Sequence, residues 1–113
     1  MKLGSLIKRL EAVEDKSVPV NYDFCELVPD GIYAYWGSGG MLNLGWRCIT
    51  QRSVESLINA LKDKIGKTIE TCEGVTIKVT EDTEIETQSK NSTLINTVID
   101  FGSYAIIETR HQE

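Results

Sequence analysis

The side chains best suited to binding chemistry gather in one glycine-rich stretch, residues 31–47. Aliphatic residues alternate with aromatic or polar ones in two runs, 32–36 and 41–47, and the segment 37–40 between them holds three glycines. This pattern predicts a β-hairpin. Because successive side chains of a strand point to opposite faces, one face collects four polar or aromatic groups. These groups belong to Tyr33, Tyr35, Asn43 and Arg47.

Two phenol rings, an amide and a guanidinium on one face suit a planar anion. Aromatic rings stack on a flat ligand, and arginine forms charge-assisted bonds with a phosphate. Trp36 is expected at the rim of the site, and Arg110 is expected as a second cation. The sequence therefore predicts a site for a small anionic, nucleotide-like ligand. Since one such face binds weakly, we also expect a homo-oligomer that builds pockets between subunits.

A purely structural interpretation of the same face stays open. Tyrosine is common in strands that are half exposed, and Gly39 and Gly40 suit a turn that needs positive φ.

No pattern in the sequence predicts catalysis or metal binding. His111, the only histidine, lies near the last residue, where a chain usually frays, and both a nucleophilic pair and a zinc site need a fixed imidazole. Cys25, Cys48 and Cys72 match no C-x-x-C spacing and are typical of buried free thiols. We therefore expect a binding protein rather than an enzyme, with no catalytic residue, metal or cofactor.

The net charge of −5 falls entirely in the second part of the chain. Residues 1–65 carry eight basic and eight acidic side chains, whereas residues 66–113 carry four basic and nine acidic ones. This distribution argues against direct nucleic-acid binding, which needs clustered lysine and arginine. It leaves a solvated face or a docking surface for a basic protein as interpretations. The docking residues would be Glu70, Glu73, Glu81, Asp82, Glu84 and Glu86.

The chain also lacks the signals of membrane insertion and secretion. No apolar run approaches the ~20 residues that span a bilayer, and charged residues interrupt the apolar positions near the N-terminus. We therefore expect a cytoplasmic protein with no membrane partner. The length of 113 residues and the 41% hydrophobic content are typical of a single domain, residues 1–113.

Periodicity predicts two amphipathic helices. Apolar residues recur at helical spacing in residues 3–14 and again in residues 54–65. The second helix is predicted to begin with Thr50 or Ser53 as N-cap and to end at Gly66.

Alternating runs predict the strands. They cover residues 18–22, 67–72, 75–79, 84–87, 93–100 and 104–109, in addition to the hairpin. Pro19 predicts an edge strand or a first-residue position, and Pro29, Asp30 and Gly31 predict a turn. The expected fold is α+β: a mostly antiparallel sheet with two amphipathic helices packed on one face.

Four short motifs resemble a group of small proteins of unassigned function encoded by tailed bacteriophages. They are the Leu-Ile-x-x-Leu pattern at 6–10, Tyr-Asp-Phe-Cys at 22–25, the hairpin at 34–46, and Ile-Gly-Lys-Thr at 65–68. The hairpin departs from the Tyr-Arg-Gly…Leu-Ala-Leu-Gly-Tyr pattern of the group, because Trp36 replaces its arginine and Asn43 its alanine.

The resemblance implies an accessory protein that acts in the host cell, where phage proteins of this size often counter host defences. The expected function is therefore sequestration of a small anionic ligand such as a nucleotide immune signal. The alternative is a proteinaceous inhibitor of anti-CRISPR or anti-restriction type. It would dock on a host defence protein or nucleic-acid enzyme through the acidic half.

Overall fold

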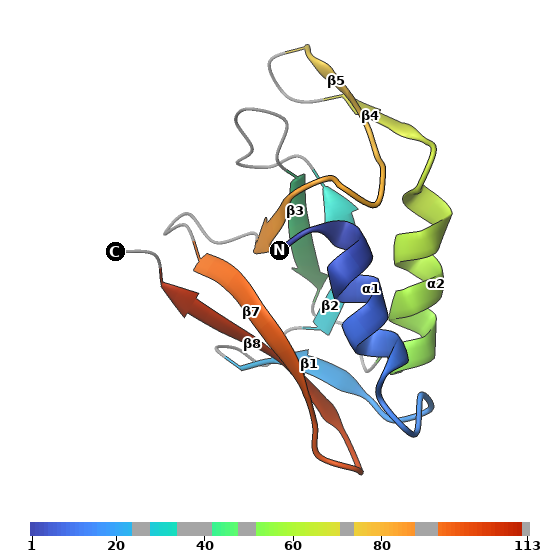
Figure 1. Ribbon diagram of the computed structural model, residues 1–113, viewed down its shortest axis with the longest axis vertical. Helices are drawn as coiled ribbons and strands as arrows, with labels where there is room; N and C mark the ends of the chain where they lie inside the picture. Colours follow the sequence, from blue (N-terminus) through green and yellow to red (C-terminus); the bar gives the residue numbers. More distant parts are fainter. Residues whose placement is uncertain (24–27, 34–41, 48–51, 71–73, 88–92, 112–113) are drawn as a thin grey trace.

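The protein has an α+β fold in the computed structural model, which describes residues 1–23, 28–33, 42–47, 52–70, 74–87 and 93–111 (Figure 1). Its two helices are α1 (Leu3–Glu11) and α2 (Val54–Lys64). The strands are β1 (Val20–Tyr22), β2 (Val28–Tyr33), β3 (Leu42–Arg47), β4 (Thr68–Glu70), β5 (Thr76–Lys78), β6 (Ile85–Thr87), β7 (Thr93–Asp100) and β8 (Ala105–His111).

The strands form separate small sheets. Two have three strands, in the orders β1-β8-β7 and β2-β3-β6, and β4 and β5 form a two-stranded sheet. The hairpin pairs β2–β3, β4–β5 and β7–β8 are antiparallel, as their short connections predict. The pairs β1–β8 and β3–β6 are parallel and join strands far apart in the chain. The predicted class is confirmed, but sequence alternation could not reveal the parallel pairs.

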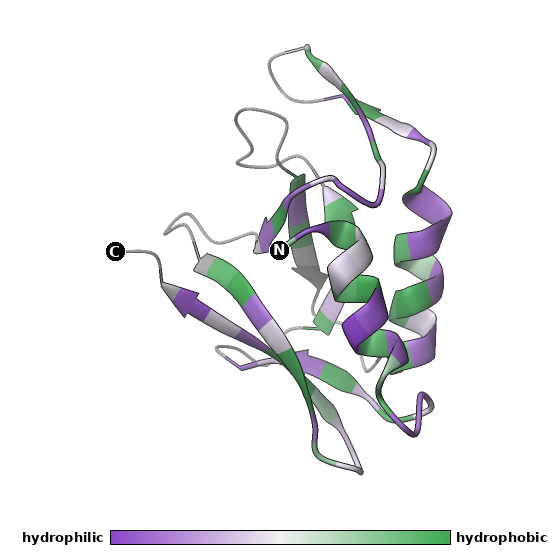
Figure 2. Cartoon of the chain, in the orientation of Figure 1, coloured by the Kyte–Doolittle hydropathy of each residue, from purple (hydrophilic) through white to green (hydrophobic). Residues whose placement is uncertain are grey.

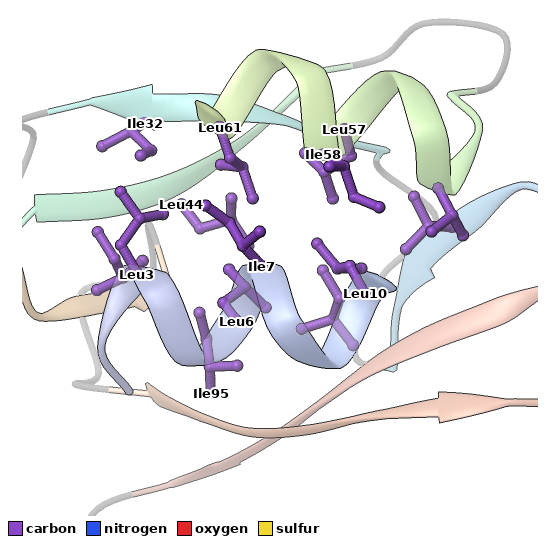
Figure 3. Packing of buried hydrophobic residues seen from close by; sticks show 14 of the residues in the cluster. Leu3, Leu6, Ile7, Leu10, Ile32, Leu44, Leu57, Ile58, Leu61 and Ile95 are labelled. Carbon is purple, nitrogen blue, oxygen red and sulfur yellow. The ribbon is translucent and has the colours of Figure 1, made fainter. Parts of the chain in front are cut away.

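Helix α1 is the centre of the hydrophobic core. Leu3, Leu6 and Leu10 have no exposed surface, because their spacing puts all three on the inner side of the helix. Figure 3 shows side chains of α2 on one side of α1 and Ile95 of β7 on the other. The hydrophobic positions of both helices turn inward, while the hydrophilic positions face outward (Figure 2).

The two helices begin in different ways. Helix α2 has the predicted cap: the Ser53 hydroxyl accepts a hydrogen bond of 3.1 Å from the backbone N–H of Ser56. The residue at the N-cap of α1 is Lys2, and its side chain makes no capping hydrogen bond. The first N–H groups of the helix, on Leu3 and Gly4, instead donate to the carbonyls of Thr83 and Glu81 at 2.9 and 2.8 Å.

Glycine marks the ends of several elements. Gly66 has a φ of +90° just after α2, and Gly102 has a φ of +87° between β7 and β8. Gly66 was predicted as the end of the second helix, and the predicted strands 93–100 and 104–109 leave a turn around Gly102, where glycine adopts positive φ without steric cost. Helix α1 ends at Glu11 rather than continuing to residue 14. Val13 nevertheless stays buried, which explains why its periodicity extended the predicted helix.

The prediction of a turn at Pro29, Asp30 and Gly31 is wrong, because all three lie inside β2. The hairpin β2–β3 is confirmed, and its connecting segment lies outside the described residues. Its register shifts between Pro29 and Ile32, which marks a bulge or similar irregularity. Pro29 is tolerated in β2 because this strand is at the edge of its sheet. Pro19 likewise precedes the edge strand β1, as predicted.

One buried tyrosine ties the two three-stranded sheets together. The hydroxyl of Tyr22, in β1, lies 3.0 Å from the Leu44 carbonyl and 2.9 Å from the Gly45 carbonyl, both in β3. Neither of the described helices has the length and apolar character needed to cross a bilayer.

Candidate functional site

The predicted binding face begins with a cross-strand pair that the structure brings together. Tyr33 in β2 and Asn43 in β3 lie directly opposite each other, and the neighbouring pair is Ile32 and Leu44. Ile32 and Leu44 are buried in the core, as alternation predicts. Tyr33 is therefore on the other face of the hairpin and is partly exposed.

Asn43 lies deeper than a surface binding face requires. Its side chain has no exposed area, and its amide Nδ2 donates to the carbonyl of Thr87 at 3.2 Å. Thr87 belongs to β6, which pairs with the edge of β3 that is not occupied by β2. Asn43 therefore joins two strands in a buried position, where a hydrogen-bonded amide costs little to bury.

The register shift in β2 brings an acidic group to Tyr33. The Tyr33 hydroxyl donates to Oδ2 of Asp30 at 2.8 Å, and Asp30 is only 8% exposed. Two residues of β2 between Pro29 and Ile32 face the single residue Gly45 of β3. An extra residue of this kind redirects side chains next to it.

The carboxylate of Asp30 changes the electrostatics of the predicted site. An anion stacked on Tyr33 would lie near a carboxylate that is shielded from water, where charges interact more strongly than in solvent. Arg47 is the residue predicted to offset such a charge. Its backbone pairs with Val28, and its side chain lies outside the described part of the structure.

The remaining predicted residues are not brought to this face by any described contact. Tyr35 and Trp36 lie outside the described residues. Arg110 is exposed on β8, opposite Leu94 of β7, and thus belongs to the other three-stranded sheet. Asp30 and Thr87 are polar residues at the hairpin that sequence reasoning missed, because Pro-Asp-Gly is typical of a turn and nothing local signals the partner strand β6.

A groove of about 400 Å³ lies between α1 and α2. Across it, the Lys62 ammonium and the Glu11 carboxylate form an ion pair at 2.9 Å. The lining residues are Gly4, Ile7, Lys8, Glu11, Lys62, Ile65 and Glu81. Two lysines and two glutamates leave the groove without a strong field of either sign, so its charges select neither an anion nor a cation.

Three acidic residues of the predicted docking surface, Glu81, Asp82 and Glu84, are exposed on the segment that leads into β6. Of the other three, Glu70 is exposed on β4, Glu86 is half-buried in β6, and Glu73 lies outside the described residues. The Asp82 side chain is 87% exposed and that of Glu84 is 50% exposed. Glu81 is also exposed, and its backbone carbonyl binds the N-terminus of α1. Carboxylates here lie beside the positive end of the α1 dipole.

These acidic residues have partial counter-charges. Lys2 lies 3.7 Å from Asp82, and the terminal ammonium of Met1 lies 3.4 Å from Glu84. The Lys2–Asp82 pair is exposed on both sides, and such pairs typically contribute below about 1 kcal/mol, so it leaves Asp82 available to a partner. In the Met1–Glu84 pair only Glu84 is exposed.

Within the described residues, no group of three or more histidine, cysteine, aspartate or glutamate side chains is placed to hold a metal ion. Comparisons with protein-family models, with curated proteins and with solved structures found no match.

Proposed function

We propose that this protein binds a positively charged partner protein and blocks the basic surface through which that partner acts. The observation that carries this proposal is the exposed carboxylate cluster of the C-terminal half, formed by Glu81, Asp82 and Glu84. Like the other acidic residues of this half, they stand against few basic ones, and complementary charge speeds encounter and excludes wrong partners.

The class of partner comes from the resemblance to phage accessory proteins. The partner is a host defence protein or a nucleic-acid enzyme, because such enzymes carry the basic surfaces that bind phosphate. The protein acts in the cytoplasm of the host cell and occupies that surface without catalysis.

Sequestration of a small anion is the competing proposal, and the hairpin geometry supports it less. Asn43 is fully buried, and Tyr33 already binds the Asp30 carboxylate. A ligand site at this face depends on Arg47, Tyr35 and Trp36. The test therefore has to separate the two binding modes.

Native mass spectrometry of the protein purified from infected, defence-bearing cells makes this separation. We expect a complex with a host polypeptide and no retained small mass. A retained mass of a few hundred daltons on a homo-oligomer would support sequestration and overturn the docking proposal.

Charge-neutralising variants identify the surface. The double variant Glu81→Gln/Asp82→Asn keeps side-chain shape and removes two charges, so the affinity for the co-purifying partner should fall by about tenfold at low salt and the salt dependence should weaken. The matched control Glu55→Gln/Asp63→Asn removes two charges from α2, and Arg47→Ala alters the other proposed site. Both should leave affinity within about twofold. If the two double variants lowered the affinity equally, the effect would come from net charge alone and would not identify a docking surface.

A further inference from the structure

An exposed aromatic pair lies at one end of the molecule. Among the described residues, the exposed large apolar side chains are Val75, Phe101 and Tyr104, at 56%, 52% and 41% exposure. Phe101 and Tyr104 stack with ring centroids 4.9 Å apart and planes inclined by 13°. They close the β7–β8 hairpin, whereas the β4–β5 hairpin lies at the opposite end of the molecule (Figure 1).

The turn beneath these rings is well defined. The N–H of Phe101 donates to the carbonyl of Tyr104 at 2.9 Å, which leaves two residues at the turn. Gly102 is the first of them and has a φ of +87°, which glycine adopts without steric cost. The N–H of Gly102 also donates to Asp100 Oδ1 at 2.8 Å. A tight turn holds the two rings in place before a partner arrives, which reduces the entropy lost on binding.

The rings continue an apolar strip on the outer face of the sheet. Ile99 and Ile106 are paired across β7 and β8 and are partly buried. Strand alternation puts Phe101 on the side of Ile99 and Tyr104 on the side of Ile106. We call these four residues the tip strip.

The opposite face at this end packs toward α1. Asp100 and Ala105 pair between the two tip-strip pairs, and Ala105 is buried. Asp100 Oδ2 accepts a hydrogen bond of 3.1 Å from the N–H of Glu14, just after α1. The aromatic rings therefore face away from the core, and the hairpin is anchored behind them.

Acidic residues lie near this end of the hairpin, on the side that faces α1. Glu14, Asp15 and Asp100 are exposed; the N–H groups of Glu14 and Gly102 lower the pKa of the Asp100 carboxyl, and the Asp15 charge acts in the opposite direction. The adjacent ammonium of Lys16 donates to the Val13 carbonyl at 3.0 Å. Among the described residues near this end, these three carboxylates outnumber the cations, which are Lys16 and, beside Thr97 of β7, Arg9.

We propose that the tip strip is an apolar contact for the same partner, in addition to the cluster of Glu81, Asp82 and Glu84, and that it takes a segment that combines apolar side chains with lysine or arginine. An aliphatic side chain would cover the Phe101–Tyr104 stack, and a neighbouring cation would lie over a ring or reach past the turn to the carboxylates of Asp100 and Asp15 on the opposite face of the hairpin. Buried aromatic residues carry much of the affinity in protein interfaces. This inference rests on the proposed function and adds an apolar contact to its charged surface.

Charge argues against two other occupants. A second copy of this chain would bring its own three carboxylates to the same place. An anionic membrane surface would repel them as well, although exposed aromatic residues often favour membrane interfaces.

The test uses a defined probe. A 14-residue peptide of lysine, arginine and leucine is titrated into the isotope-labelled full chain, and amide chemical shifts are followed by NMR. We expect shifts at residues 99–106 and 14–16. Phe101→Ser and Tyr104→Ser should each weaken binding by about tenfold or more, since aromatic anchors dominate such contacts. Val75→Ser, an equally exposed apolar position in the other hairpin, should leave binding within about twofold.

Three results would overturn the inference. They are shifts that avoid the hairpin, equal binding of a matched peptide with glutamate in place of its cations, and stronger binding to phosphatidylserine vesicles than to the peptide. Shifts confined to residues 81–84 and abolished by Glu81→Gln/Asp82→Asn would reject the tip strip while leaving the proposed function intact. If no part of the chain bound the peptide at low salt, both the inference and the proposed function would be rejected. Because Phe101 and Tyr104 are tested separately, one unfolded variant leaves the other to decide.

Discussion

At the level of single residues, the hairpin shows how burial changes what a polar side chain does. Asn43 and Tyr33 share a cross-strand pair, yet one is enclosed by β6 and the other reaches the Asp30 carboxylate. Residue type alone suggested that both would meet a ligand. The neighbouring strand and the local register shift determine that each already has a partner within the protein.

Asp100 provides a prediction for pH. Hydrogen bonds from the N–H groups of Glu14 and Gly102 lower the pKa of its carboxyl, while desolvation and the Asp15 charge act in the other direction. The pKa in the folded state is thus below that in the unfolded chain, about 4. The unfolded chain therefore binds more protons in this range, and the stabilising contribution is present above about pH 4 and lost as pH falls through the lowered pKa.

Thermal unfolding of Asp100→Asn between about pH 6 and 2 measures this contribution. We expect wild type to have the higher Tm above about pH 4, and the difference from the variant should shrink as pH falls. Glu70→Gln removes one exposed carboxylate from β4 and serves as the control for net charge. A Tm difference that stays constant across the range would contradict the assignment.

At the level of elements, the two helices obtain their N-terminal hydrogen bonds from different sources. Helix α2 uses Ser53, directly before it in the sequence, whereas α1 uses carbonyls of the segment 80–84, far along the chain. Gly4 permits that approach, because an added Cβ would lie 3.0 Å from the Cβ of Glu81. A local sequence pattern can therefore locate the start of α2 but not the anchor of α1.

Ser53→Ala tests the local cap. Loss of the hydroxyl leaves the Ser56 N–H without its acceptor, and the free energy of unfolding should fall by about 1 kcal/mol. Denaturant titration measures this change. Ser56→Ala, at an exposed position of the same helix, should stay within about 0.5 kcal/mol of wild type. Equal losses for the two variants would show that the cap contributes nothing specific.

At the level of the whole molecule, α1 connects parts of the fold whose described strands belong to separate sheets. It packs against α2 on one side and against β7 on the other, and the segment before β6 holds its N-terminus (Figure 3). Tyr22 adds a direct link between the two three-stranded sheets. We therefore expect the described elements to unfold together.

Leu6→Ala tests this cooperativity. The side chain is fully buried, so its truncation should cost about 2–5 kcal/mol through lost burial and the cavity left behind. Amide hydrogen exchange should show protection falling together in α2 and in β7–β8. Val75→Ala, at an exposed site, should change stability by less than about 0.5 kcal/mol. Loss of protection in only one of the two regions would contradict a shared core.

The sequence by itself determined the features that depend on neighbouring residues. Helical spacing predicted both helices, Ser53 predicted the start of α2, and Gly66 and Gly102 predicted where the chain reverses or leaves a helix. These features follow from backbone geometry within a few residues, so the local pattern is sufficient. The α+β class follows from these helices together with the alternating runs that predict the strands.

Only the tertiary structure decided which distant segments meet. It paired β3 with β6 and β1 with β8, buried Asn43, and brought Asp30 to Tyr33 within a strand where a turn was predicted. It also stacked Phe101 on Tyr104 at an exposed end of the β7–β8 hairpin, whose Asp100 accepts a hydrogen bond from the N–H of Glu14 just after α1. Parallel pairing and burial depend on groups far apart in the chain, whose meeting is set by the packing of the whole core and leaves no signal in the residues on either side.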